Sequence, residues 1–440
     1  MSKPVTLTDS RFGKWGWSMV IYAFIMYYFW AGIATDALNV YPGAFAAKIG
    51  CDPNLLLGYA TPAGFISVIG VLFFGRLIIK TGVKKLTAWT LIVTGVLYII
   101  FGFVTTPIGY FIILTLFTFT AVEFGMIATS TLMSNWFPRK KGIALGWATM
   151  GAPLCTATFV ALVAALYGTV GITTASIIIG AAIIIVGIAT FFWVKDFPEE
   201  VGAYPDNIPE GLEELKRQRE EMANYKSPFT VKKLLKDRDM WFVAVGFGFL
   251  WMVTIGVVSQ FIPRMISVGI PQPTALMMLT ITSIIGIAGS YFWGWLDQKI
   301  GTKKATIIYG FSYIIALLLL ILAAVPALIY VALIFVGLGI GGLLNLMASM
   351  VISVYGRYDF TAANSVIMTI ANLLMKCAFI IMALALSASG GNYTLPYIIF
   401  IIIDILGIIL IAFVTDKCKG KVDLPDVPQE APAEVTEVVE

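Results

Sequence analysis

Residues 75–85 of this chain read Gly-Arg-Leu-Ile-Ile-Lys-Thr-Gly-Val-Lys-Lys, and residues 294–304 read Gly-Trp-Leu-Asp-Gln-Lys-Ile-Gly-Thr-Lys-Lys. Six positions are identical at a constant spacing of 219 residues. The same spacing aligns the segment 142–167 with the segment 362–386. An internal repeat of this kind predicts two structurally related halves of the same orientation.

Apolar segments flank both copies of the repeat. The 440 residues are 59% hydrophobic and 12% charged, whereas soluble domains have about 45–50% apolar and about 25% charged residues. A bilayer-spanning helix needs roughly 20 apolar residues. Runs of this length lie at 17–38, 56–79, 86–104, 110–133, 142–167, 174–194, 241–262, 274–296, 305–324, 327–355, 362–386 and 395–414. We therefore predict an all-α integral membrane protein with twelve transmembrane helices in two six-helix bundles.

The basic residues predict the orientation of these helices. If the N-terminus is cytoplasmic, nearly all of the 29 lysine and arginine residues fall in cytoplasmic loops, linker and tails. Lys48 and Arg264 fall on the other side, and Lys376 falls inside a span. By the positive-inside rule we expect a multi-pass protein of the cell (inner) membrane with both termini in the cytoplasm. The net charge of +4 then reflects topology, and nucleic acid is not an expected partner.

A charged, proline-containing segment separates the two sets of spans. Its composition is that of a linker. The predicted parts are an N-terminal bundle (1–194), a cytoplasmic linker (195–239), a C-terminal bundle (240–414) and an acidic cytoplasmic tail (415–440).

Several classes of chemistry are not favoured by the sequence. It contains no histidine, and its four cysteines lie far apart, so neither a metal site nor a disulfide framework is expected. No ATP-binding P-loop is present. The acidic residues of the spans are scattered, so an enzyme is not expected and no cofactor is implied.

Two further motifs carry a family resemblance. Residues 135–151 read Asn-Trp-Phe-Pro-Arg-Lys-Lys-Gly-Ile-Ala-Leu-Gly-Trp-Ala-Thr-Met-Gly, and residues 196–202 read Asp-Phe-Pro-Glu-Glu-Val-Gly. With the repeated loop, twelve spans and central linker, the chain resembles the major facilitator superfamily, and these motifs are similar to its oxalate/formate antiporter and monocarboxylate transporter group. The resemblance implies that a cation on span eight and a lysine on span eleven bind an anionic substrate. Lys376 lies on the matching span eleven, whereas Ser290 lies near the span-eight position. This favours a substrate with one negative group.

Ionisable residues within the spans are the first candidates for a site. Such a residue costs about 2.5–3.5 kcal/mol at the centre of a span, so each needs a partner, a wet cavity or a changed protonation state. Lys376, with Asn372 one turn earlier, is expected to attract a carboxylate. Glu123 and Asp404 are candidates for proton coupling, Glu123 also for substrate contact, and Asp36 for gating or substrate selection. The alternative for each is a structural ion pair, a hydrogen bond or a hydrated helix end.

Neutral polar and aromatic residues supply weaker candidates. Tyr27, Tyr28 and Trp30 on span one, Gln260 on span seven and Asn345 on span ten could line a ligand site. Aromatic residues also sit at membrane interfaces, and amides also join helices. Both interpretations stay open at this point.

The sequence therefore predicts a secondary active transporter, an antiporter or a proton-coupled symporter, of small organic anions such as monocarboxylates. It is expected to act by alternating access, as a monomer in the lipid bilayer, with protons as a candidate coupling ion. The surplus of acidic residues leaves a cation, zwitterion or drug transporter of the same fold as the alternative. A nutrient sensor without transport is less favoured, because the linker and tail contain no recognisable signalling domain.

Overall fold

A computed structural model describes residues 9–51, 53–208, 225–322, 326–415 and 417–420. This described part is helical and contains no β-strand, as predicted. The linker segment 209–224 and most of the acidic tail, residues 416 and 421–440, lie outside it.

The first half is built from α1 (Gly13–Ala34), η1 (Asp36–Asn39), α2 (Tyr41–Ile49), α3 (Pro53–Thr81), α4 (Val83–Phe101), α5 (Pro107–Val122), η2 (Glu123–Ala128), α6 (Thr129–Trp136), α7 (Lys141–Thr149) and α8 (Gly151–Trp193). Two short turns of helix follow, η3 (Pro198–Val201) and η4 (Pro205–Asn207). The second half contains α10 (Val231–Leu234), α11 (Arg238–Ser259), α12 (Phe261–Ser267), α13 (Gln272–Ile300), α14 (Thr302–Ile321), α15 (Pro326–Ala388) and α16 (Thr394–Ala412).

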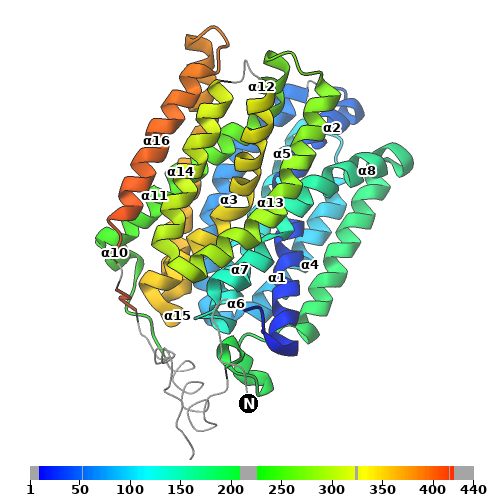
Figure 1. The fold of residues 1–440 in the computed structure, drawn as a ribbon. Helices are drawn as coiled ribbons and strands as arrows, with labels where there is room; N and C mark the ends of the chain where they lie inside the picture. The colour runs from blue at the N-terminus through cyan, green and yellow to red at the C-terminus, as the bar shows by residue number, and fades with distance from the viewer. Residues whose placement is uncertain (1–8, 52, 209–224, 323–325, 416, 421–440) are drawn as a thin grey trace, which may run out of the picture.

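Ten helical segments in the described part are long and apolar enough to cross a membrane. Two of them, Lys141–Trp193 and Leu328–Ala378, have 53 and 51 residues, more than twice the roughly 20 residues that one crossing requires. Each bends at a glycine in the left-handed region, Gly171 at φ 78° and Gly356 at φ 73°. Figure 1 shows α8 folding back at such a bend. The multi-pass all-α architecture is confirmed, and the number twelve stays a prediction.

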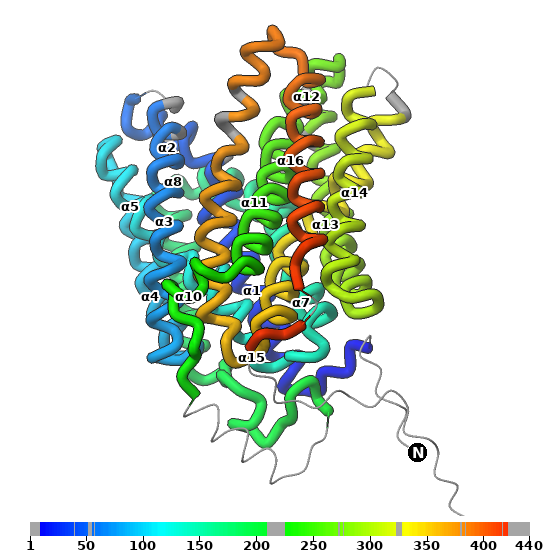
Figure 2. The backbone as a smooth tube through the Cα atoms, turned by 90° about the vertical axis from the view of Figure 1, so that its left-hand side faces the viewer, coloured from blue at the N-terminus to red at the C-terminus, as the bar shows by residue number. Residues whose placement is uncertain are grey.

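The helices form two groups that lie side by side. Figure 2 shows α3, α4 and α5 on one side, α13, α14 and α16 on the other, and α15 between them. Large apolar side chains cover the outer surface, among them Phe192 at 80% exposed and Ile69 at 63%. Such a surface suits a lipid environment, where exposed apolar groups cost nothing. The domain boundaries at residues 194 and 240 stay a prediction.

The repeated loops adopt the same backbone conformation. Gly82, between α3 and α4, has φ 81° and ψ 163°, and Gly301, between α13 and α14, has φ 88° and ψ 149°. Glycine is the residue that reaches this region without strain. The carboxylate of Asp196 accepts a hydrogen bond of 2.7 Å from the Lys84 backbone N–H at the start of α4. The sequence repeat is thus a structural repeat as well.

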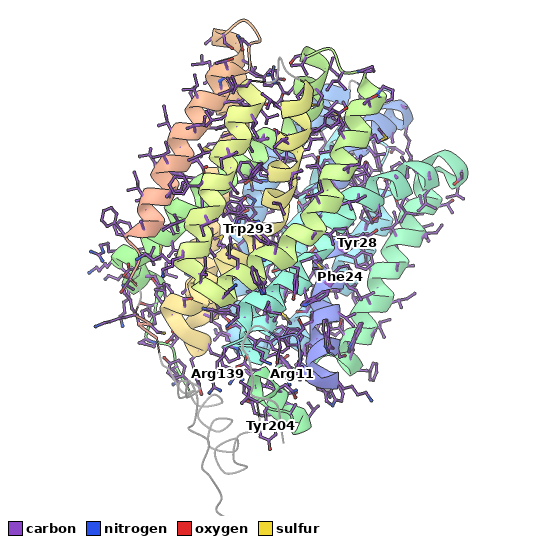
Figure 3. All side chains as sticks on the ribbon, in the orientation of Figure 1. Arg11, Phe24, Tyr28, Arg139, Tyr204 and Trp293 are labelled. Carbon is purple, nitrogen blue, oxygen red and sulfur yellow. The ribbon has the colours of Figure 1, made fainter. Side chains whose placement is uncertain are left out.

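One end of the molecule carries the basic loops, and we call it the basic end. Figure 3 places Arg11 and Arg139 there together with Tyr204, whereas Tyr28 and Trp293 lie about half-way along the bundle. The two halves are joined at this end. Gln298 of α13 donates a hydrogen bond of 2.8 Å to the Arg139 carbonyl oxygen.

A buried ion pair and a glycine crossing complete this closure. Arg357 of α15 pairs with Glu199 of η3 at 3.2 Å, and both side chains are about 5% exposed or less. At the crossing of α7 and α13, a Cβ on Gly294 would overlap the Gly142 carbonyl oxygen. Backbone meets backbone there, so the molecule is closed at its basic end.

Candidate functional site

Lys376 lies where the two halves of the molecule meet. It is on α15, half-buried, and a Cβ built on Gly64 of α3 would lie 3.5 Å from its Cε and 3.6 Å from its Nζ. Within the described ranges its ammonium group has neither a hydrogen bond nor an ion pair. Lys376 lies twelve residues before the end of α15 at Ala388, and no acidic side chain of the described ranges compensates the charge of its ammonium group.

Asn372 lies one helical turn before Lys376 and links α15 to η2. Its Nδ2 donates a hydrogen bond of 2.8 Å to the Met368 carbonyl oxygen and lies 3.8 Å from the Met126 sulfur. The side chains of η2 are all buried. The predicted pair Lys376 and Asn372 is thus found at a junction of α15, α3 and η2.

The segment η2 is a π-helix, and it also contacts α1. A Cβ on its Gly125 would overlap the indole ring of Trp30, which is 9% exposed. Only a glycine lets the ring approach the backbone this closely. Trp30 therefore packs behind the same short segment whose Met126 contacts Asn372.

The chemistry of this junction follows from the unpaired ammonium. An ammonium group in an apolar setting attracts an anion strongly, since two unit charges 4 Å apart interact by about 4 kcal/mol at an effective dielectric constant near 20. Asn372 can add hydrogen bonds to a carboxylate if its side chain turns toward the ligand. We take Lys376, Asn372, Gly64, Met126 and Trp30 as the candidate substrate site.

The carboxyl group of Glu123 contacts α4 and lies outside the junction that contains Lys376. Its carboxyl group is fully buried, with Oε1 3.0 Å from the Thr87 hydroxyl and Oε2 2.6 Å from the Thr90 hydroxyl of α4. No hydrogen bond or ion pair in the described part of the chain joins it to Lys376. The two predicted residues thus lie in separate environments.

The tyrosines of α1 join helices within the first half. Tyr27 shares a hydrogen bond of 3.2 Å with Ser130 of α6, and Tyr28 shares one of 3.1 Å with Thr158 of α8. The carboxylate of Asp36, in η1, accepts a hydrogen bond of 2.8 Å from the Thr156 hydroxyl of α8. These contacts join α1 and η1 to α6 and α8, and the predicted roles of all three residues in a substrate site stay predictions.

Ser290 and Asn345 lie together at the crossing of α13 and α15. The Ser290 hydroxyl donates a hydrogen bond of 2.9 Å to the Gly341 carbonyl oxygen. The Asn345 Nδ2 donates a hydrogen bond of 2.7 Å to the Ser290 carbonyl oxygen. Both side chains are buried. They stabilise this crossing, and neither contacts the Lys376 ammonium group.

Gln260 lies at the end opposite the basic end. Its Oε1 accepts a hydrogen bond of 3.2 Å from the Tyr393 hydroxyl, and the Arg264 guanidinium lies 5.4 Å from the Tyr393 ring centre. These residues join α11, α12 and the start of α16, away from Lys376.

Asp404 is enclosed in the second half. The residue is fully buried on α16, and neither carboxyl oxygen has a hydrogen-bond partner. The phenols of Tyr309 and Tyr313 on α14 are its electrostatic neighbours. No group of three or more acidic or cysteine side chains that could hold a metal ion occurs in the described ranges.

Sequence reasoning did not find three residues of this region. Gly64 has no side chain to mark it, and its role follows only from the packing of α3 on α15. Thr87 and Thr90 are three residues apart on one face of α4, and buried threonines at that spacing could have suggested a polar partner for an acid on a neighbouring helix.

The family comparison agrees with the resemblance found in the loops. The model of the Major Facilitator Superfamily matches residues 16–375 and, in a second match, residues 267–435.

Two curated relatives are similar to the chain in sequence. The "Oxalate:formate antiporter" of Oxalobacter formigenes is 22% identical over 205 residues, which span 45% of this chain and 44% of that protein. The "Probable galactarate/D-glucarate transporter GudP" of Escherichia coli K12 is 24% identical over 372 residues, 78% of this chain and 81% of that protein.

Two solved structures share the fold. The proton:xylose symporter XylE superposes with a TM-score of 0.70 at 15% identity, covering 91% of this chain and 97% of the symporter. The human organic anion transporter MFSD10 superposes with a TM-score of 0.68 at 11% identity, covering 90% of this chain and 99% of that transporter.

Proposed function

This chain belongs to the Major Facilitator Superfamily, and from that premise we propose that it is a secondary active transporter of small organic anions that carry one carboxylate at the binding site. The unpaired ammonium group of Lys376 is the observation on which this proposal depends. The two curated relatives support the organic-anion part of this proposal, because the ligands in their names are carboxylates; formate carries one carboxylate, and oxalate, galactarate and glucarate carry two.

The number of cations sets the substrate class. Among the lysines and arginines of the described ranges, Lys376 lies at the junction of the two halves, and Ser290 lies near the span-eight position where the family resemblance implies a second cation. One ammonium group balances one carboxylate. A monocarboxylate, or a longer acid that presents one carboxylate to Lys376 and hydroxyls elsewhere, meets this requirement.

Transport in this proposal proceeds by alternating access. Lys376 and Gly64 belong to different halves, so a substrate bound to the Lys376 ammonium group lies at the interface of the two halves. Opening the basic end separates α7 from α13 and breaks the buried Arg357–Glu199 pair. In the predicted orientation, with both termini in the cytoplasm, the basic end is the cytoplasmic one.

The alternative is a transporter of cations or zwitterions, which the buried acids Asp36, Glu123 and Asp404 favour. In the structure Asp36 and Glu123 bond to threonine hydroxyls, and Asp404 is enclosed on α16. None of the three forms an ion pair with Lys376. The anion is therefore the better supported substrate.

Ligand-induced thermal stabilisation of the purified protein tests this proposal. A ligand at 100 times its dissociation constant stabilises the folded state by about 2.7 kcal/mol. We expect small carboxylates to raise the melting temperature of the wild type, and Lys376→Ala to lose this shift. Lys299→Ala, which removes an exposed lysine of the basic end, is the matched control and should keep it. Stabilisation by amines alone, or an undiminished carboxylate shift in Lys376→Ala, would reject the proposal.

A further inference from the structure

A cluster of exposed cations lies where the chain enters the second half. It is formed by residues 230–241, which comprise α10 and the first turn of α11, and we call it the basic corner. Figure 1 shows α10 on the outer edge of the molecule, close to the level at which α16 ends. The apolar span Arg238–Ser259 begins in this corner, and the Phe242 ring lies 6.3 Å from the ring of Phe413, which directly follows the span Thr394–Ala412. The basic corner is therefore at the expected boundary between membrane and water.

Local hydrogen bonds define the shape of the basic corner. The Thr230 hydroxyl accepts a hydrogen bond of 3.3 Å from the Lys233 backbone N–H at the start of α10. The Trp241 Nε1 donates a hydrogen bond of 2.9 Å to the Leu235 carbonyl oxygen, which ties α11 to the end of α10. Leu234 is fully buried. The cations of the corner thus stand on a defined turn of the backbone.

The two acidic residues of the basic corner already have partners. The Lys419 ammonium group forms ion pairs with both Asp237 and Asp239. The Tyr355 hydroxyl donates a hydrogen bond of 2.7 Å to the Asp237 carboxylate, and the Thr415 backbone N–H donates one of 3.0 Å to the Asp239 carboxylate. Lys419 therefore takes up the negative charge of the corner from within the molecule.

The exposed cations have no comparable compensation. Within the described ranges Lys232, Lys233 and Lys236 form no ion pair. Arg238 lies 4.0 Å from Asp239, and its side chain is 70% exposed. Since Lys419 already pairs with Asp239, this contact leaves the guanidinium largely uncompensated. Four positive charges between residues 232 and 238 therefore face outward.

Apolar side chains are exposed beside these cations. Leu235 and Trp241 are exposed in the basic corner itself, and Phe413 is exposed at the neighbouring end of α16. Tryptophan is typical of the membrane interface, and basic clusters next to a span attract anionic headgroups. A water-soluble anion would neutralise the cations but leave the apolar groups in water. A phospholipid covers both, because its phosphate can meet the cations and its acyl chains the apolar groups.

We propose that the basic corner binds an anionic phospholipid of the leaflet at the basic end. Lys232 and Lys236 contact the headgroup phosphate, and Leu235 and Trp241 contact the acyl chains. The bound lipid holds the end of the linker at the bilayer, at the point where Lys419 ties the C-terminal segment to α11. This role is independent of the transported substrate, so its test requires none.

Thermal unfolding of the full-length protein in micelles that contain phosphatidylcholine tests this inference, with phosphatidylglycerol as the added probe. A ligand of the folded state raises the melting temperature. Phosphatidylglycerol should do so at concentrations at which inorganic phosphate or more phosphatidylcholine has no effect. Lys232→Gln combined with Lys236→Gln should raise the phosphatidylglycerol concentration for half of this effect by about 25-fold, because one lysine near an anionic surface is worth about fivefold. Lys232→Arg combined with Lys236→Arg keeps both charges and should stay within about threefold of the wild type.

Lys80→Gln combined with Lys85→Gln is the matched control. This pair removes two exposed lysines of the first repeated loop, outside the basic corner. It should change the half-effect concentration by less than about threefold. An equal change in both glutamine pairs would mean a general attraction between lipid and the basic end, and would overturn the site. Equal stabilisation by inorganic phosphate, lost in the Lys232 and Lys236 glutamine pair, would mean a free anion and would also overturn it.

The acidic residues of 421–440 are the competing occupant, because they follow Lys419 closely in the chain. Changing all six of them to their amides in the full-length chain tests this alternative. If lipid occupies the basic corner, the half-effect concentration of phosphatidylglycerol should stay within about threefold of the wild type. A decrease of about tenfold or more would mean that the acidic segment covers the corner in the natural chain, and the lipid would be the wrong occupant.

Discussion

A carboxylate introduced at position 64 should disable the substrate site from within. A Cβ built on Gly64 lies 3.6 Å from Lys376 Nζ, which is ordinary van der Waals contact, so the site accepts a side chain without displacing backbone. In Gly64→Asp the carboxylate carbon lies one bond beyond this Cβ and the carboxylate oxygens lie two bonds beyond it. They can reach the ammonium group within the roughly 4 Å of an ion pair. The variant places an internal anion where the substrate is expected to bind.

The size of the effect follows from this distance. Two unit charges 4 Å apart attract by about 4 kcal/mol at an effective dielectric constant near 20, and part of this is offset by desolvation and by ordering of the side chain. A net competition of about 2–3 kcal/mol corresponds to a roughly 30- to 150-fold loss of carboxylate affinity, since about 1.4 kcal/mol is tenfold.

Gly64→Asn is the matched control, because asparagine has the same shape as aspartate without the charge. Dissociation constants from ligand-dependent melting curves, with uptake in proteoliposomes, measure the difference between the two variants. We expect Gly64→Asn to stay within about fivefold of the wild type and Gly64→Asp to lose most binding. Equal carboxylate affinity in both variants would refute the role of Lys376, and tighter binding of amines to Gly64→Asp would favour the cation alternative.

Three further predictions concern the framework. Gly294→Ala should destabilise the protein by about 1–3 kcal/mol, because the added Cβ would overlap the α7 backbone. Gly168→Ala should leave stability unchanged, because a Cβ there meets no atom within 4 Å. Equal melting temperatures of the two variants would contradict the close packing of α7 on α13. Glu199→Gln should cost about 3–5 kcal/mol, because it leaves Arg357 buried without its partner, and addition of Arg357→Gln should recover part of that loss in thermal unfolding. Asp404→Asn should leave uptake and melting temperature nearly unchanged, since neither oxygen has a partner to lose; a large loss would show that the carboxylate itself is required.

Much of the fold could be predicted from local properties of the sequence. Spanning helices follow from the length of apolar runs, and the similarity of the halves follows from the repeated loops. The turns at Gly82 and Gly301 have the same conformation because the same residue types recur at the same spacing. The number of spans is harder to establish, because the helices on either side of Gly171 and of Gly356 are joined by a single non-helical glycine and count as one long helical segment each.

The site was predictable only in part. Lys376 and Asn372 are identified by a charge inside a span and an amide one turn away, and both properties are local. Which way Glu123 faces depends on η2, and one extra residue in a helical turn cannot be recognised from an apolar pattern. Gly64 contributes by having no side chain, so only the packing of α3 against α15 shows its position.

The distances between the halves indicate from which end Lys376 is reached. Gly294 lies nearest the basic end, and a Cβ built on it would overlap the backbone of the opposite helix. A Cβ built on Gly146 would lie 2.9 Å from the Ser290 carbonyl oxygen. A Cβ built on Gly286 would lie 3.2 Å from the Pro153 Cβ. The contact between α13 and the α7–α8 segment thus loosens with distance from the basic end.

The contact between α3 and α15 follows the same trend. A Cβ on Gly75 would overlap Ser365, whereas one on Gly64 would lie 3.5 Å from the nearest atom of Lys376. Lys376 therefore lies beyond the tightly packed part of the interface, on the side away from the basic end. Closing the molecule over Lys376 from that side would bury an unpaired ammonium group, which is expensive. A bound carboxylate removes this cost, so the charge that attracts the substrate also makes closure depend on the substrate.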